Sequence, residues 1–238
     1  MRYLDLTLPT AAENLALDEA LLDEAEANET PDETLRLWEP RQPMVVVGRS
    51  SQFHVEVQLD ACRALGIPVL RRPSGGAAIV AGPGCLMYAL LLSYRTRPQL
   101  RILSESHRWV LGTLAAALGT FAAGVECRGT SDLTIGGRKF SGNSARCRRN
   151  HLLYHGTLLY DFPLDSIERC LAMPPRMPDY REGRSHEGFV TNLPLRSETI
   201  RAALVEAFAA GEPCDAWPEH RTKQLVAEKY SLPGWMAS

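Results

Sequence analysis

Residues 71–79 (RRPSGGAAI) contain a pair of adjacent glycines, and this is the first segment of the sequence that could bind a ligand. Glycine lets the backbone N–H groups of Gly75 and Gly76 approach a ligand closely, and two arginines precede them. Such a segment can bind an anion, for example a phosphate or a carboxylate. A tight turn explains the same residues, so both interpretations stay open at this point.

Residues 131–144 bring together a turn, a carboxylate and a lysine. Gly136 and Gly137 have the chemistry of a two-residue hairpin turn, and Lys139 stands just past them. Lys139 is one of three lysines among 26 basic residues, so its compact ammonium stands out in a chain that otherwise uses arginine. Asp132 supplies a carboxylate that could hold Mg²⁺. A solvated hairpin with a surface lysine is the alternative.

A third glycine, Gly156, interrupts the strand-like run at residues 154–159. A glycine inside a strand often marks the close approach of a ligand or of another backbone, although a bulge would explain it equally well. His151 and His155 belong to the same region. Four residues along a strand span about 13 Å, which is too far for a shared metal ion, so we interpret both as ordinary sheet histidines.

Several common catalytic motifs are absent. There is no G-x-x-x-x-G-K-[ST] loop, and Met87 occupies the third glycine position of a dinucleotide fingerprint. The lack of G-x-S-x-G and H-E-x-x-H removes the simplest interpretations as a serine hydrolase or a zinc protease. The six cysteines form no C-x-x-C pair, so we expect free thiols in a reducing compartment.

The elements that must position these residues mix strands and helices without a regular parallel rhythm. Thr10 and Glu13 have capping-box spacing, and Gly119 could form a left-handed helix cap. The predicted helices cover residues 10–28, 59–65, 103–118, 164–171, 198–210 and 220–230. The predicted strands cover residues 2–8, 34–38, 44–47, 67–72, 77–80 and 86–93, followed by a strand-like stretch at 127–160. This pattern favours an α+β fold, with a mixed or antiparallel sheet core and helices packed on the outside.

Length and charge limit the class of protein. The 238 residues suit one large domain, so we expect a single domain over residues 1–238. The net charge of -2 gives no general field for nucleic acid or anionic lipid, so a polyanion would need a local basic patch. No apolar run is long enough to span a membrane, and no signal peptide begins the chain. We therefore expect a cytoplasmic protein that binds neither membrane nor nucleic acid.

In their order and spacing, the three glycine-containing segments resemble the lipoate-protein ligase A family, within the wider group of biotin and lipoate protein ligases and octanoyl transferases. The resemblance covers most of the chain and implies a biotin/lipoate protein ligase catalytic-domain-like fold. The motifs that carry it are residues 14–19 (NLALDE), 35–38 (LRLW), 43–52 (PMVVVGRSSQ), 71–79, 131–133 (SDL), 137–143 (GRKFSGN), 155–159 (HGTLL) and 190–193 (VTNL).

The resemblance implies an activity. Such enzymes activate the carboxylate of lipoate, or of octanoate, with MgATP to give an acyl-adenylate, and then pass the acyl group to one lysine of a lipoyl domain. ATP, Mg²⁺ and lipoate are therefore the expected cofactors and substrates. The expected partner is a lipoyl domain of a 2-oxoacid dehydrogenase complex or the H protein of glycine cleavage.

The resemblance also assigns residues. Lys139 matches the family's catalytic lysine, which contacts the acyl carboxylate, the adenylate phosphate and the carbonyl oxygen. Asp132 matches the position near Mg²⁺ and the nucleotide, and Val46, Ile79 and Leu159 are expected on an apolar tunnel for the acyl tail. The loop over the acyl group and the phosphate matches Arg72, Ser74, Gly75 and Gly76. The other implied substrate- or adenylate-binding residues are Ala77, Gly137, Ser141, Gly142, His155, Gly156 and Thr157.

The chain departs from the family pattern in its residues and its length. Ala77 replaces a third glycine, Ala81 a histidine and Cys85 an asparagine. The chain also ends close to where two-domain ligases continue into an accessory domain, so we expect no accessory domain here. A separate accessory subunit, or a reaction that makes no adenylate, would account for the lack of this domain.

Two alternatives remain. In the first, the protein is an octanoyl transferase of the same fold that moves octanoyl from acyl carrier protein through a cysteine thioester, with Cys127 as the candidate nucleophile. Cys85 and Cys147 are weaker candidates, and the sequence around Cys127 is more similar to the ligases. In the second alternative the protein is a non-catalytic lipoate-binding subunit, although the presence of Lys139 argues against it.

Overall fold

The longest uninterrupted apolar run of the sequence forms the central strand of the molecule. In the computed structural model, which describes residues 1–237, this strand, β6 (Cys85–Ser93), is buried at every position. Its neighbours β2 (Thr34–Trp38) and β10 (His151–Leu159) run antiparallel to it and are equally buried. A strand covered on both faces needs apolar residues on both, which explains a continuous run instead of an alternation.

Two sheets contain the strands of the described residues. The larger is mixed and has eight strands in the order β11-β1-β2-β6-β10-β9-β8-β7, and the smaller has four in the order β12-β4-β3-β5. The remaining strands of the larger sheet are β1 (Arg2–Asp5), β7 (Val125–Arg128), β8 (Asp132–Ile135), β9 (Arg138–Cys147) and β11 (Glu212–Pro213). Those of the smaller sheet are β3 (Met44–Val47), β4 (Val69–Arg71), β5 (Ile79–Ala81) and β12 (Met236–Ala237).

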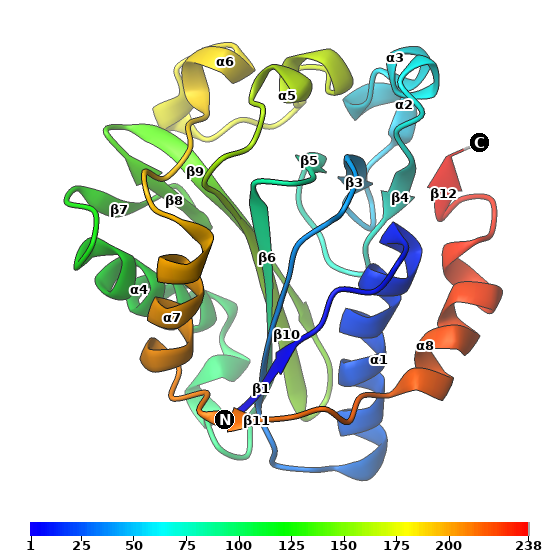
Figure 1. Cartoon of the computed structure of the whole chain (residues 1–238), viewed down its shortest axis with the longest axis vertical. Helices are drawn as coiled ribbons and strands as arrows, with labels where there is room; N and C mark the ends of the chain where they lie inside the picture. The colour runs from blue at the N-terminus through cyan, green and yellow to red at the C-terminus, as the bar shows by residue number, and fades with distance from the viewer. Residues whose placement is uncertain (238) are drawn as a thin grey trace.

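Helices cover both faces of the larger sheet (Figure 1). On one side lie α1 (Ala11–Asn28) and α8 (Glu219–Leu225), which a π-helical turn extends to Tyr230. On the other lie α4 (Leu103–Gly119) and α7 (Ser197–Ala207). Alternate residues of β6 follow this division: Leu90 packs in the core with α4 and α7, and Leu91 packs in the core with α1.

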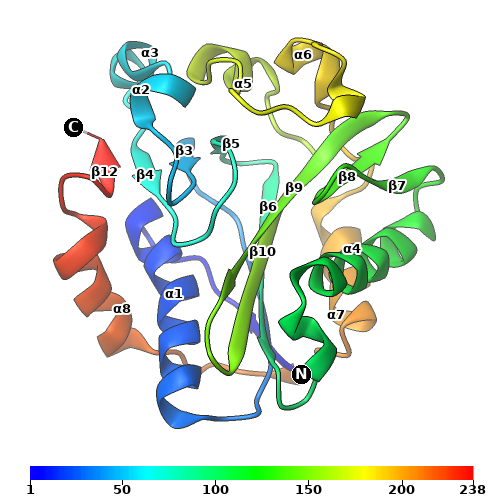
Figure 2. The ribbon, with the colours of Figure 1, turned by 180° about the vertical axis from the view of Figure 1, so that it is seen from behind.

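Four short helices gather at the end of the molecule that holds β3, β4 and β5, as Figure 2 shows. They are α2 (Phe53–Glu56), α3 (Leu59–Ala64), α5 (Asp165–Cys170) and α6 (His186–Phe189). Single 3-10 turns occur at Pro98–Arg101 and Asp179–Arg181. The connections between these elements, together with β5, β9 and β10, surround the cavities described below.

The structure confirms the predicted α+β class and most predicted elements, including the capping box of Thr10 and Glu13. Three details were wrong. The first strand ends at Asp5, before residue 8, and the strand predicted at 77–80 begins only at Ile79 because the preceding residues form a loop. Gly119 ends α4 without a positive φ, and Gly124, with a φ of 86°, takes the left-handed conformation instead.

Among the described residues, no helix is both long enough and apolar enough to span a membrane. The cytoplasmic location stays a prediction.

Candidate active site

The loop between β4 and β5 is folded around the side chain of Arg72. Its Nη2 donates hydrogen bonds to the carbonyl oxygens of Gly75 (2.6 Å) and Ala77 (3.0 Å), and its Nη1 donates one to that of Val46 (3.2 Å). The side chain is buried, and this burial lowers the pKa of Arg72 to about 10. The guanidinium is therefore still charged at neutral pH and fixes the loop from within.

The loop presents backbone N–H groups that lack an acceptor. No described residue accepts a hydrogen bond from the N–H groups of Gly75, Gly76 or Ala77. The φ of Gly76 is 91°, and a side chain at Gly48 would clash with the Gly76 carbonyl, so both positions need glycine. Because consecutive unpaired N–H groups form an anion-binding nest, the loop can receive a phosphate or a carboxylate.

Ser74 ties the loop to the larger sheet. Its hydroxyl accepts a hydrogen bond from Nε of Arg72 (3.2 Å) and shares another with Nε2 of His155, 2.5 Å away. The other ring nitrogen of His155, Nδ1, lies 3.9 Å from Oδ2 of Asp18. Asp18 in turn forms an ion pair with the fully buried Arg36.

This order of groups is that of a serine hydrolase triad, but the position of the serine gives it a different role. Ser74 is only 1% exposed and does not line either cavity described below. Its hydroxyl therefore cannot reach a substrate there, and the chain from Ser74 to Arg36 holds the glycine loop against the sheet.

Lys139 lies in β9, next to a carboxylate of the neighbouring strand. Its Nζ is 2.7 Å from Oδ1 of Asp132, and the other oxygen of that carboxylate accepts a hydrogen bond from the Tyr180 hydroxyl (2.7 Å). Gly142 makes room for the ammonium, because an added Cβ would be 2.9 Å from Nζ. The Lys139 side chain remains 28% exposed, so a substrate can reach it.

Two cavities meet at this lysine. The first, of about 360 Å³, borders the glycine loop and is called the loop cavity; the second, of about 140 Å³, is called the apolar cavity. Lys139 lines both. The apolar cavity is walled mainly by hydrocarbon, including Ile79, Phe140, Leu159, Ile167, Leu171 and Phe189. An acid with a long apolar tail could therefore place its tail among these side chains and its carboxylate beside the ammonium.

Most residues predicted for the site line one or both cavities. In the loop cavity these are Arg72, Gly76, Ala77, Asp132, Lys139, Gly142, His155, Gly156 and Thr157. In the apolar cavity they are Ala77, Lys139, Ser141, Gly142 and Thr157. Of the predicted tunnel residues, Ile79 and Leu159 reach the apolar cavity, whereas Val46 lines only the loop cavity. Ser74, Gly75 and Gly137 lie outside both linings.

Two of the predicted glycines have structural roles. Gly137 and its neighbour Gly136 have φ of 70° and 56°, which confirms the hairpin turn ahead of Lys139. Gly156 allows a close approach, but the approaching groups are the side chains of Asn143 and Tyr88, which hydrogen-bond to each other. The strand glycine is therefore explained by packing within the protein.

Several cavity residues escaped the sequence analysis. They are Glu56, Asn143, Arg176, Arg181 and His186. Glu56 accepts a hydrogen bond from the Ala78 backbone (2.7 Å) at the wall of the apolar cavity. Arg176 is exposed, lines both cavities and has no hydrogen-bond or ion-pair partner among residues 1–237. Four of the five lie outside the glycine-containing segments, so no local sequence pattern marks them. Asn143 lies within such a segment, but an asparagine there does not by itself indicate a role.

The cysteines contribute no side chain to these cavities, although Cys85 pairs with Leu159 of the apolar cavity across β6 and β10. Cys127 is a largely exposed residue of β7, opposite Leu133. Its thiol is still partly shielded from water by the surrounding protein, and this desolvation raises its pKa above the ordinary value of 9.0. Cys85 is buried in β6, and burial raises its pKa as well. In the part of the chain that the structure describes, no cysteine lines either cavity. Neither Cys127 nor Cys85 has the lowered pKa of an activated nucleophile.

Asp132 fits a nucleotide-bound Mg²⁺, although not a metal site built by protein alone. Within residues 1–237, no three His, Cys, Asp or Glu side chains lie close enough together to hold a metal ion. Mg²⁺ that accompanies a nucleotide usually takes one or two carboxylates and completes its shell with phosphate and water. The Asp132 oxygens each have one partner here, so each keeps a lone pair for such an ion.

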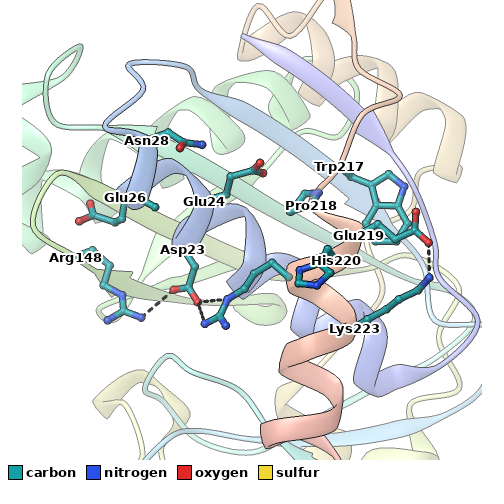
Figure 3. A pocket seen from close by; sticks show the side chains of 12 residues that line it. Asp23, Glu24, Glu26, Asn28, Arg148, Trp217, Pro218, Glu219, His220 and Lys223 are labelled. Atoms are coloured by element: carbon teal, nitrogen blue, oxygen red, sulfur yellow. Dashed lines mark hydrogen bonds and ion pairs between the residues drawn. The ribbon is translucent and has the colours of Figure 1, made fainter.

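A wider surface depression, of about 1200 Å³, lies between the end of α1 and the start of α8. Asp23 there accepts hydrogen bonds from Arg148 (3.1 Å) and Arg221 (2.6 Å), and Lys223 pairs with Glu219 (Figure 3). The two ion pairs of Asp23 fasten α8 and the β9–β10 turn to α1. None of the predicted site residues lines this depression.

A family model described as the lipoyl protein ligase A/B catalytic domain matches residues 10–209. The chain belongs to this family. It is 26% identical over 264 residues to the octanoyltransferase LipM of Carboxydothermus hydrogenoformans, covering 99% of this chain and 97% of that protein. It is also 26% identical over 236 residues to the lipoate-protein ligase LplJ of Bacillus subtilis, covering 93% of this chain and 69% of that protein.

A solved relative has the same fold. It comes from a study of a bi-partite lipoate protein ligase and its E2 lipoyl domain from Thermoplasma acidophilum. The TM-score is 0.81 and the identity 22%, with 98% of this chain and 94% of the other covered. The expected family and fold are thus confirmed, and the protein is an enzyme of the lipoate ligase and octanoyltransferase family.

Proposed function

We propose that the protein is a lipoate-protein ligase, which activates lipoate or octanoate with MgATP and transfers the acyl group to a lysine of a lipoyl domain. The observation that carries this proposal is the position of Lys139 where the loop cavity meets the apolar cavity. A single ammonium there can contact both the carboxylate of an acyl chain and a phosphate held by the glycine loop.

Each part of the site contributes one step in this proposal. The apolar cavity binds the hydrocarbon tail, and the N–H groups of Gly76 and Ala77 bind the phosphate. Bound MgATP would supply the AMP group to the acyl carboxylate and release pyrophosphate, AMP would leave when the acceptor lysine attacks, and Asp132 is the side chain that would hold the Mg²⁺. Lys139 stabilises the negative charge that develops on the acyl oxygens as the acceptor lysine attacks, because a fixed cation in a partly dry site acts there more strongly than in water.

The octanoyltransferase alternative draws support from the relatives, several of which are named octanoyltransferase LipM. That route, through a thioester, needs a cysteine near the acyl group. The absence of the described cysteines from the linings of both cavities, and the raised pKa of Cys127, favour the ligase. A separate accessory subunit, as in a bi-partite ligase, remains compatible with this proposal.

A donor exchange tests the proposal. The purified protein is incubated with an apo-lipoyl domain and either lipoate with MgATP, octanoate with MgATP, or octanoyl-acyl carrier protein without ATP, and intact masses are recorded. The ligase proposal predicts acylation of the domain only in the samples with ATP. Acylation from octanoyl-acyl carrier protein alone, with octanoyl found on Cys127, would establish the transferase instead.

A further inference from the structure

Two arginines beside the glycine loop carry positive charge that the protein does not neutralise. Arg49 and Arg146 form no side-chain hydrogen bond or ion pair with any residue from 1 to 237, and Nε of Arg146 is shielded from solvent without an acceptor. The buried Nε of Arg146 costs stability, because this N–H has lost water without gaining a partner. Such a cost is expected where another molecule supplies the missing acceptor.

Hydrogen bonds place the segments that carry both arginines beside the glycine loop, next to the loop cavity, although neither arginine lines it. The Arg49 N–H donates to the carbonyl oxygen of Ser74 (2.8 Å), and the Ser144 hydroxyl donates to that of Gly75 (2.9 Å). Ser144 lines the loop cavity, and Arg146 lies two residues further along β9, on the same face of the strand. The glycine loop is thus flanked on both sides by segments that carry these arginines.

Arg49 and Arg148 strengthen the positive field at Arg146, and Glu19 offsets part of it. The pKa of Arg146 is lowered by burial and then by the charges of Arg49 and Arg148, which shows that the three act within one local field. The acids of α1 on this side already have partners: Asp18 pairs with Arg36, Glu19 with Lys229, and Asp23 with Arg148 and Arg221. A local positive patch therefore exists on a chain with a net charge of -2.

We propose that Arg49 and Arg146 form a docking surface for acidic side chains of the acceptor domain, which guides its target lysine into the loop cavity. This inference rests on the proposed function. A domain whose lysine reaches Lys139 must cover the surface around the loop cavity, and the segments that carry these two arginines flank the glycine loop there. Two unpaired charges suit a small acidic protein surface better than nucleic acid, which usually takes about 6–10 phosphate contacts.

Charge reversal tests the docking surface by direct binding. Arg49→Glu and Arg146→Glu are titrated with an apo-lipoyl domain from a 2-oxoacid dehydrogenase E2 chain, at low and high ionic strength. Arg196→Glu is the matched control, because Arg196 is exposed, has no side-chain partner within the described chain and begins α7 on the opposite side of the sheet. Arg146→Gln removes the charge without reversing it.

Each reversal is expected to raise the Kd for the domain about tenfold at low salt, with a smaller effect at high salt, while the control binds as wild type. The KM values for lipoate and ATP should stay within about twofold, because the arginines contact only the acceptor. An unchanged Kd in both variants, or a rise in the KM for ATP in place of the Kd, would overturn the inference. So would binding of a DNA duplex that the reversals abolish.

The two proposals fail differently. Wild-type protein that binds the domain through these arginines but acylates it from no donor contradicts the proposed function and supports the docking surface. Acylation by wild type, with equal Kd values in every variant, overturns the docking surface and leaves the proposed function standing.

Discussion

The Nζ of Lys139 lies 2.7 Å from Oδ1 of Asp132, at the junction of the loop cavity and the apolar cavity. The two residues belong to adjacent strands, β9 and β8, whose hairpin turn at Gly136 and Gly137 brings them together. The carboxylate fixes the ammonium while leaving it partly exposed to both cavities. Its role can therefore be separated from that of the lysine itself.

Replacement of Asp132 by Asn should lower kcat by up to about 100-fold, because an ammonium displaced by about 1 Å loses much of its effect on the transition state. Tyr180→Phe removes only the hydrogen bond to the other oxygen of Asp132 and should change kcat no more than about threefold. The measurement is the rate of lipoyl-domain acylation at saturating lipoate and ATP. Equal rates for wild type and Asp132→Asn would show that the ion pair has no positioning role.

Gly142 offers a test that leaves the lysine in place. The Cβ of Gly142→Ala would lie 2.9 Å from Nζ and 3.0 Å from Cε of Lys139, so the flexible end of the lysine must move away. We expect kcat to fall about tenfold or more with little change in Tm. Gly112→Ala is the control, because nothing lies within 4 Å of its Cβ on α4. That variant should keep full activity and gain up to about 1 kcal/mol of stability; a similar activity loss in both variants would refute the explanation.

The buried ion pair between Asp18 and Arg36 predicts a large effect on folding. Arg36 is fully buried, so Asp18→Asn leaves its charge without a counter-ion and should lower the free energy of unfolding by about 3–5 kcal/mol. Asp60→Asn, which disrupts the exposed pair with Arg63, should change it by no more than about 1 kcal/mol. Urea denaturation followed by circular dichroism measures both. A loss below about 1 kcal/mol in Asp18→Asn would mean that the pair contributes little.

The raised pKa of Cys127 predicts how its alkylation depends on pH. Because the thiolate is the reactive form and the pKa lies above 9.0, the rate with iodoacetamide should keep rising through pH 9, with no plateau near neutrality. The rate is measured by mass spectrometry on a variant in which Cys147 and Cys214 are serine. Acylation kinetics of Cys127→Ser should match those of wild type. A rate plateau below pH 8 would instead mark an activated thiolate and favour the transferase.

The fold was largely predictable because its main elements are long or strongly patterned. The continuous apolar run of β6 and the capping box of α1 each point to one structure, and the ranges of β2 and β3 matched the prediction. Strands β3, β4 and β5 of the smaller sheet were predicted as strands, but their pairing into a second sheet was not, because the pattern of one short strand does not show its partner; the two-residue β12 was missed.

The site was predictable where a local motif carries it. Lys139, Asp132 and the glycine loop were found in this way, whereas Arg176 enters from a distant proline-bearing segment that gives no local pattern. The sequence also could not predict that Ser74 ties the glycine loop to the larger sheet, because its partner His155 lies 81 residues away and only the fold brings the two together. Motif spacing therefore identifies chemistry more readily than it identifies which groups support it.

Formation of the activated acyl group is the most direct test of the central assignment. Wild type, Lys139→Arg and Lys139→Ala are incubated with lipoate and MgATP without an acceptor, lipoyl-AMP is quantified by mass spectrometry, and an apo-lipoyl domain is then added. We predict lipoyl-AMP and acylated domain with wild type, and rates lower by about 10²–10³-fold in both variants, since arginine cannot replace a point cation beside Gly142. Acylation by Lys139→Ala at the wild-type rate would contradict the account.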